Sequence, residues 1–172
     1  MLTAFGLALV AQAPATNAPA ANADSSVPAN LNQLMRGAFY PPANVVFFAQ
    51  ADNPAEIKFV PGHDPNMSTD PLTSTFGGWQ AVENAALTLA ESASLLSVPG
   101  RVCSNGTAVP VTHPDWVKFV KDVRDAGLKA YAAAKAKDQD KIIEAADPLN
   151  ASCTGCHRRF RDRRAPATRC TP

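Results

Sequence analysis

Cys153, Cys156 and His157 form a Cys-x-x-Cys-His segment near the end of the 172-residue chain. On an α-helix these three residues stand at positions i, i+3 and i+4, so their side chains project from one face. The two thiols can then bond the vinyl groups of one porphyrin while the imidazole reaches the iron from the same side. This is the spacing of c-type haem attachment. The segment therefore predicts one covalently attached haem c, with His157 as an axial ligand of its iron.

Two other uses of paired cysteines fit this chain less well. A Cys-x-x-Cys redox motif normally follows a strand in a βαβ unit, whereas the residues just before Cys153 have a helical pattern. A structural zinc site needs a second pair of ligands. The remaining cysteines, Cys103 and Cys170, are single and far apart in the sequence. Haem attachment remains the favoured interpretation.

The composition restricts the class of protein. With 16 Lys and Arg against 15 Asp and Glu, the chain has a net charge of +1 and gives no indication of nucleic-acid binding. No segment is long and apolar enough to span a bilayer. Abundant alanine favours packed helices over a sheet. Because no Ser-His-Asp set, phosphate loop or pair of carboxylates stands out, we do not expect an enzyme.

The N-terminus is typical of an exported protein. Residues 2–10 are apolar, and Ala11-Gln12-Ala13 supplies a small-x-small cleavage pattern, although no Lys or Arg precedes the apolar run. We predict an atypical signal peptide over residues 1–13, a flexible Ala/Pro-rich tether over 14–29, and a haem-binding domain over 30–172. A periplasmic or otherwise exported protein agrees with c-type haem, which is generally attached outside the cytoplasm.

Apolar residues recurring every three or four positions predict four helical segments. The first begins at about residue 29, is broken or kinked at Pro41-Pro42, and resumes from 43 to about 50. The others span about 75–97, with Phe76 and Trp79 inward, about 112–136, and about 138 to beyond the haem motif. Short and medium loops favour an all-α, antiparallel up-down-up-down four-helix bundle. Since Cys153 and Cys156 share the apolar stripe of the last helix, the haem is expected near the C-terminal end of helix four.

In that topology several residues that could contact the haem or its iron are expected at one end of the bundle, which we call the haem pole. Met35, Cys103, His113 and Cys170 all fall near this pole. An exported protein meets an oxidising compartment, so we predict a disulfide between Cys103 and Cys170. Met35 is a candidate sixth ligand of the iron, although a methionine on an apolar stripe more often fills a core. His113, and His63 in a turn-rich loop, are weaker candidates.

The segment Cys153–Arg161 resembles the haem site of the cytochrome c′ family. In that family an aromatic residue follows the histidine by three positions and a basic residue by four, and Phe160 and Arg161 occupy these positions. The resemblance implies a four-helix bundle with its haem motif near the C-terminus. It also makes a homodimer compatible with this chain, because related bundles often pair through their first two helices. Pro41-Pro42 and the two single cysteines depart from the common pattern.

The resemblance bears on the distal side of the iron as well. Low-spin relatives place a methionine of helix one on the iron, within a Leu-Met-Lys-like segment that Leu34-Met35-Arg36 resembles. This implies Met35 as the distal ligand. Typical members instead keep an open, five-coordinate iron behind an apolar side chain, a place that Leu31 or Leu34 would take here.

These expectations lead to two candidate functions. The first is single-electron transfer between redox partners by an exported monohaem c-type cytochrome. The alternative is an open-site haem protein that binds nitric oxide or carbon monoxide. An arginine-rich C-terminus would either steer an acidic redox partner or simply be a solvated helix end; its members are Arg158, Arg159, Arg161, Arg163, Arg164 and Arg169.

Overall fold

The computed structural model describes residues 27–57, 64, 68–162 and 165–171. Within these ranges the chain is helical and contains no β-strand, only one isolated bridge between Val102 and Ala108. The expected all-α class is therefore confirmed. The predicted signal peptide, residues 14–26 of the tether, His63, Arg163 and Arg164 lie outside the described residues.

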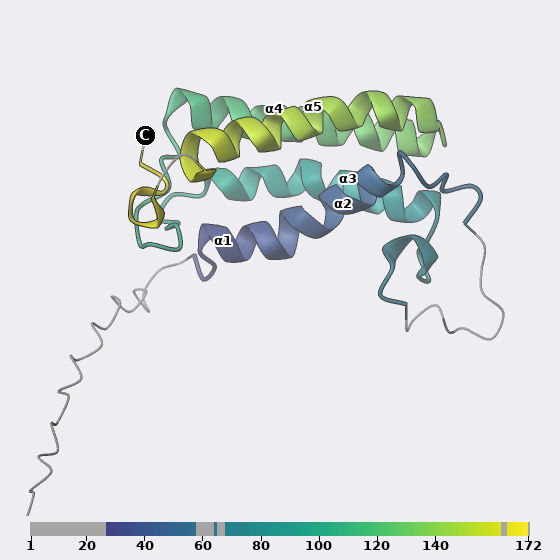
Figure 1. The fold of residues 1–172 in the computed structure, drawn as a ribbon, viewed down its shortest axis with the longest axis horizontal. Coiled ribbons are helices and arrows are strands. Elements are labelled where there is room, and N and C mark those ends of the chain that lie inside the picture. The colour runs from purple at the N-terminus through teal and green to yellow at the C-terminus, as the bar shows by residue number, and fades with distance from the viewer. Residues whose placement is uncertain (1–26, 58–63, 65–67, 163–164, 172) are drawn as a thin grey trace, which may run out of the picture.

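The helices lie side by side over most of their length (Figure 1). Helix α5 packs along α4, α4 along α3, and α3 along α2. The start of α1, the loop between α3 and α4, and the C-terminal tail all lie at one end (Figure 1). Among the residues described, no helix has both the length and the hydropathy that a bilayer crossing requires. The bounds are α1 Leu31–Leu34, α2 Tyr40–Phe48, α3 Trp79–Ser92, α4 Pro114–Lys135 and α5 Gln139–His157.

The first helical stretch is continuous from α1 into α2. It starts with a capping box, in which the side chains of Asn30 and Gln33 each accept a hydrogen bond from the other's backbone N–H at 2.9 Å. A π-helical turn over Met35–Phe39 then leads into α2, whose first turn holds Pro41 and Pro42. Proline is tolerated there because first-turn N–H groups have no partner within their helix. The chain is therefore not broken at the two prolines, which was one of the two expected outcomes, and a π-turn precedes them.

Helix α3 begins at Trp79, later than the expected start near residue 75. Gly78 adopts φ +59°, a conformation that disfavours other residues, and its N–H donates to the Leu72 carbonyl at 2.8 Å. This turn separates Phe76 from the helix and leaves its side chain 60% exposed. The prediction that Phe76 faces the core was wrong, because the apolar periodicity was extended across two glycines. A 3₁₀ turn, Ala93–Ser97, continues the helix at its other end.

Helices α4 and α5 begin and end close to the predicted positions. The backbone N–H of Asp115 donates to His113 Nδ1 at 3.2 Å, so His113 caps α4. Helix α5 runs through Pro148, which cannot donate to the carbonyl of Glu144. That carbonyl accepts a hydrogen bond from Lys129 Nζ of α4 at 3.0 Å instead. A π-helical turn over 158–162 and a 3₁₀ turn over 166–168 complete the C-terminus.

Small residues let α3 and α4 approach closely. A Cβ atom on Gly127 of α4 would lie 2.8 Å from the backbone nitrogen of Ala90 and 3.1 Å from the carbonyl oxygen of Ala86. Both partners are backbone atoms of α3, so they cannot move aside without moving the helix. The helices therefore pack through their backbones at this point, and Gly127 sets their separation.

We predict that Gly127→Val destabilises the fold by about 1 to 3 kcal/mol, because the added side chain overpacks the α3–α4 contact. Gly37→Ala is the matched control, since nothing lies within 4 Å of a Cβ atom at Gly37. Alanine there should leave stability unchanged or raise it by up to about 1 kcal/mol. Urea unfolding followed by helical circular dichroism measures both. Equal unfolding free energies for the two variants would contradict the close approach.

Candidate haem-binding site

The Cys-x-x-Cys-His motif occupies the last turns of α5. Cys153 and Cys156 are half-buried and are not joined to each other as a disulfide. Gly155, between them, lies against the ring of Phe119 of α4, since a Cβ atom there would stand 2.5 Å from Phe119 Cε1. The motif is thus fixed against α4 on one side and leaves both thiols and the imidazole available on the other.

The motif lines one wall of a cavity of about 430 Å³ between α5, α4 and the first helical stretch. This volume lies within the range of roughly 300 to 1,000 Å³ usual for ligand and cofactor pockets. A smaller cavity of about 100 Å³ adjoins it at the end where the C-terminal tail lies. The two share several lining residues, so we treat them as one site. Its apolar wall includes Phe39, Phe47, Leu89, Leu96, Trp116, Phe119, Val120 and Val123.

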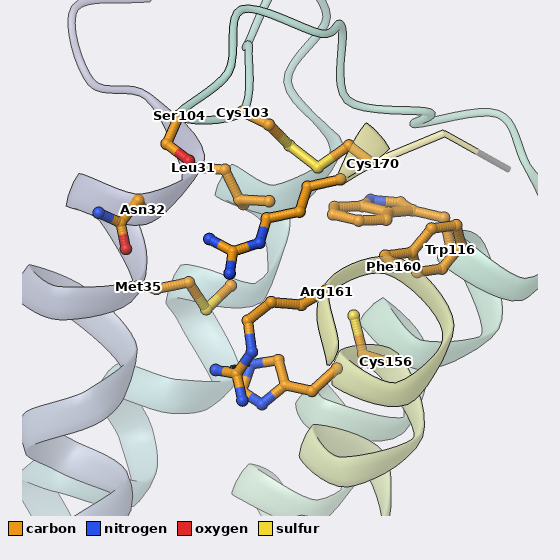
Figure 2. A pocket seen from close by; sticks show the side chains of 12 residues that line it. Leu31, Asn32, Met35, Cys103, Ser104, Trp116, Cys156, Phe160, Arg161 and Cys170 are labelled. Carbon is orange, nitrogen blue, oxygen red and sulfur yellow. Dashed lines mark hydrogen bonds between the residues drawn. A yellow bond between two sulfur atoms is a disulfide. The ribbon is translucent and has the colours of Figure 1, made fainter. Parts of the chain in front are cut away.

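Met35 lines the same cavity as the motif, from the first helical stretch. Figure 2 shows its side chain pointing toward Arg161 and Cys156. Leu31, one turn earlier, lines the smaller cavity, whereas Leu34 is buried elsewhere in the core. The structure therefore brings together Met35 and the three motif residues that the sequence singled out.

Hydrogen bonds from the loop after α3 hold the start of this stretch. The backbone N–H of Leu31 donates to the Val102 carbonyl at 2.8 Å. The buried guanidinium of Arg101 donates from Nη1 to the Ala29 carbonyl at 2.5 Å. Because both contacts fall within two turns of Met35, they fix where its thioether enters the cavity.

Burial sets the protonation of the motif. It raises the pKa of the Cys153 thiol, and it raises the pKa of Cys156 to about 12, with the neighbouring thiol adding to the shift and Arg161 opposing it. Burial also lowers the pKa of His157, helped by the positive charge of Arg161 and opposed by Asp162. Near neutral pH the site therefore holds two protonated thiols and a neutral imidazole, whose unprotonated nitrogen can bind a metal. In this structure His157 Nε2 lies 3.5 Å from Arg161 Nη1.

No three His, Cys, Asp or Glu side chains converge as a metal site anywhere in the described ranges. A haem iron needs only one or two protein ligands because the porphyrin supplies the others. Two thiols and one imidazole on a helix face, a mostly apolar cavity and a facing thioether fit a covalent haem.

The predicted disulfide is present and closes one end of the site. Cys103 and Cys170 are bonded, with Cα atoms 6.5 Å apart, and both line the smaller cavity (Figure 2). Asn105 Nδ2 also donates to the carbonyls of Pro166, Ala167 and Arg169 at 3.0 to 3.2 Å. The C-terminal tail is thereby fixed to the loop that precedes α4.

The arginines of the C-terminus do not form one exposed patch. Arg159 Nε donates to Asp115 Oδ2 of α4 at 3.1 Å, and its guanidinium lies 5.4 Å from the Phe160 ring centroid. Arg169 is half-buried and lines the smaller cavity. Arg158 and Arg161 are exposed. Of the C-terminal arginines that the structure describes, these two are the ones exposed enough to steer an acidic partner, as the sequence suggested.

Sequence reasoning missed several residues of the site. Trp116 was not among the site residues expected from the sequence, yet it lines both parts of the cavity. Its place in the first turn of the third predicted helix, near the haem pole, was a usable signal. His113 was a candidate ligand, but its Nδ1 caps α4 and its ring packs edge-on against Phe160, with centroids 5.7 Å apart. His157 is the only histidine among the described residues that line the cavity.

Compared with known proteins, the chain matches no protein-family model, and it has no significant match among curated proteins or solved structures.

Proposed function

We propose that this protein is an exported monohaem c-type cytochrome that carries single electrons between redox partners. The observation that carries the proposal is that Cys153, Cys156, His157 and Met35 line one mostly apolar cavity of suitable volume. The haem would supply an iron that alternates between its ferric and ferrous states. The chain would attach the haem, ligate its iron and keep water away from it.

Attachment falls to the two cysteine thiols. Each thiol would add across one vinyl group of a haem, forming one carbon–sulfur bond and giving its hydrogen to the neighbouring vinyl carbon, so that no oxidant would be needed. Burial keeps both thiols protonated, with the pKa of Cys156 raised to about 12. Cys153 and Cys156 are therefore not oxidised to a disulfide with each other, and both sulfurs stay available for attachment of the haem.

Ligation falls to His157 and Met35, on opposite walls of the cavity. The lowered pKa of His157 keeps its imidazole neutral, which is the form that binds iron. The thioether of Met35, as the other ligand, would raise the reduction potential of the iron and suit it to electron transfer. The cavity wall of Trp116, Phe119 and Val120 would keep water from the iron.

The fold and the compartment belong to the same proposal. Neighbouring helices that pack in sequence order, with the site near the end of α5, support an up-down-up-down four-helix bundle of the cytochrome c′ type. The Cys103–Cys170 disulfide supports export, because disulfides persist in oxidising compartments such as the periplasm.

Replacing Met35 by alanine tests the ligand assignment and separates the two candidate functions. We expect the native protein to be low-spin in both oxidation states and, when reduced, indifferent to carbon monoxide. Met35→Ala should convert it to a high-spin form that binds carbon monoxide. Leu31→Ala is the matched control, since Leu31 lines the smaller cavity from the same stretch and should leave the iron low-spin.

The opposite result favours the alternative function. If the native protein is already high-spin and binds carbon monoxide, and Met35→Ala leaves its absorption spectrum unchanged, then Met35 only fills space. The site would then be an open one for nitric oxide or carbon monoxide.

An acidic redox partner would dock at the end of α5. Arg158 and Arg161 are exposed there, next to the cavity that holds the motif. Attraction between opposite charges speeds association and is screened by salt. We therefore expect electron transfer with a physiological partner to slow about tenfold or more between low and high ionic strength. A rate independent of salt, measured by stopped flow, would contradict docking through these arginines.

A further inference from the structure

The C-terminal tail delivers one arginine side chain into the site. The tail is held by the Cys103–Cys170 disulfide, by the Asn105 side chain, and by the backbone N–H of Cys170, which donates to the Phe160 carbonyl at 2.9 Å. Arg169, the residue before the disulfide, lines the smaller cavity together with Met35 and His157. Its backbone is therefore fixed by anchors on both the loop before α4 and the end of α5.

One nitrogen of the Arg169 guanidinium, Nε, has no hydrogen-bond partner among the described residues, although the carboxylate of Asp162 is near enough for Arg169 to lower its pKa. This Nε atom is buried. A buried charged donor left unsatisfied is costly, so such a group normally faces an acceptor. The other arginines of the cavity differ, because Arg161 Nε bonds to Asp162 Oδ1 at 2.5 Å and Arg36 is exposed.

The cavity itself favours an anion. The described residues that line its two parts include Arg36, Arg161 and Arg169, and no aspartate or glutamate. A guanidinium binds a carboxylate through two parallel hydrogen bonds, which gives both strength and direction. A carboxylate beside Arg169 would therefore satisfy the unpaired Nε.

We propose that Arg169 binds a carboxylate inside this cavity, and that the carboxylate belongs to the haem. This inference rests on the proposed function. A haem carries its two carboxylates on the edge of the macrocycle away from its vinyl groups. With Cys153 and Cys156 holding the vinyl edge on α5, the carboxylate edge would face other elements, among them the tail, which supplies the half-buried Arg169 with its unpaired Nε. The disulfide then serves to position a haem-binding residue.

The test compares Arg169→Gln with Arg158→Gln in the full-length, haem-loaded protein. Both variants lose one positive charge, but Arg158 is exposed and lines neither cavity. Covalent haem content is measured first, as the pyridine haemochrome, and the midpoint potential is then measured between about pH 6 and pH 8. Asp162, whose pKa is lowered chiefly by its bond to Arg161 and in smaller part by the charge of Arg169, stays ionised over this range because the bond to Arg161 remains in the variant.

We expect Arg169→Gln to lower the midpoint potential at neutral pH, because an uncompensated carboxylate stabilises the ferric iron. Without the arginine the pKa of that carboxyl rises, so the potential should also fall with rising pH in this variant alone. Arg169→Lys should restore part of the shift. The Cys103→Ser/Cys170→Ser variant, which frees the tail, should shift the potential in the same direction as Arg169→Gln.

Three results would overturn the inference. If Arg169→Gln matches Arg158→Gln while both carry covalent haem, Arg169 binds no haem carboxylate, and the proposed function stands without it. If added inorganic phosphate moves the potential of the native protein but not that of Arg169→Gln, the arginine takes a dissolved anion instead. If the native protein has no covalent haem, the proposed function itself fails, and the haem carboxylate is excluded with it.

Discussion

The variant Cys153→Ser/Cys156→Ser is expected to contain no covalently bound haem. Serine preserves the size of each side chain and the helix but does not add to a vinyl group under the conditions in which thiols do. Haem that enters the cavity should then be extracted completely by acidified acetone, whereas the native protein should keep all of it. Haem staining on denaturing gels gives an independent readout of the same loss.

The matched control makes the same chemical change at the other pair of cysteines. Cys103→Ser/Cys170→Ser removes the disulfide, and in the chain-entropy model opening a loop of this length, with a sequence separation of 67, costs roughly 4 kcal/mol. This control should be less stable yet retain covalent haem. Covalent haem in Cys153→Ser/Cys156→Ser would show that the motif is not the attachment point.

Replacing Trp116 by alanine should destabilise the fold by about 3 to 5 kcal/mol, more than Gly127→Val does. Trp116 is 2% exposed, and its ring packs edge-on against Phe160 with centroids 5.1 Å apart. Its Nε1–H donates to the Leu96 carbonyl at 3.0 Å. Because it also lines the cavity, we expect the alanine variant to bind haem poorly as well as to unfold more easily.

Trp79 provides the matched control for this prediction. It is also buried, at 8% exposed, but it lines neither part of the cavity. Its Nε1 makes no hydrogen bond within the described part of the chain. Phenylalanine should therefore cost more at Trp116 than at Trp79, by about 1 kcal/mol for the lost hydrogen bond. Urea unfolding curves measure the difference, and a larger loss for Trp79→Phe would contradict the role given to Trp116.

The helices nearest the site were the ones best predicted from sequence. Helices α4 and α5 have long apolar stripes, and α4 has an N-cap in His113, so local signals agree with the packing. The π-turn after α1 was not predicted. Pro41 and Pro42 signal a disturbance of the helix in the sequence, but they do not specify that it takes the form of a π-turn before them. The error at Phe76 arose since periodicity carries no information on a glycine with positive φ.

The residues of the site also divide into those that local spacing predicts and those that depend on tertiary contacts. Cys153, Cys156 and His157 share a face because of helix geometry alone, so their spacing was enough to place them together. Met35 needed the topology as well, and its position depends on how the loop after α3 bonds to the start of α1. The entry of Arg169 into the cavity was not predicted, because the expected Cys103–Cys170 disulfide does not by itself set the direction of the neighbouring side chain, and the contacts of Asn105 and Phe160 with the tail have no sequence signal.

Attachment of a single covalent haem is tested most directly by the intact mass of the denatured protein. The protein should be produced as the full chain in a host that exports it and attaches c-type haem. We predict one species whose mass is that of the exported polypeptide plus one haem. A mass equal to the polypeptide alone, from protein exported with its Cys103–Cys170 disulfide formed, would contradict the account.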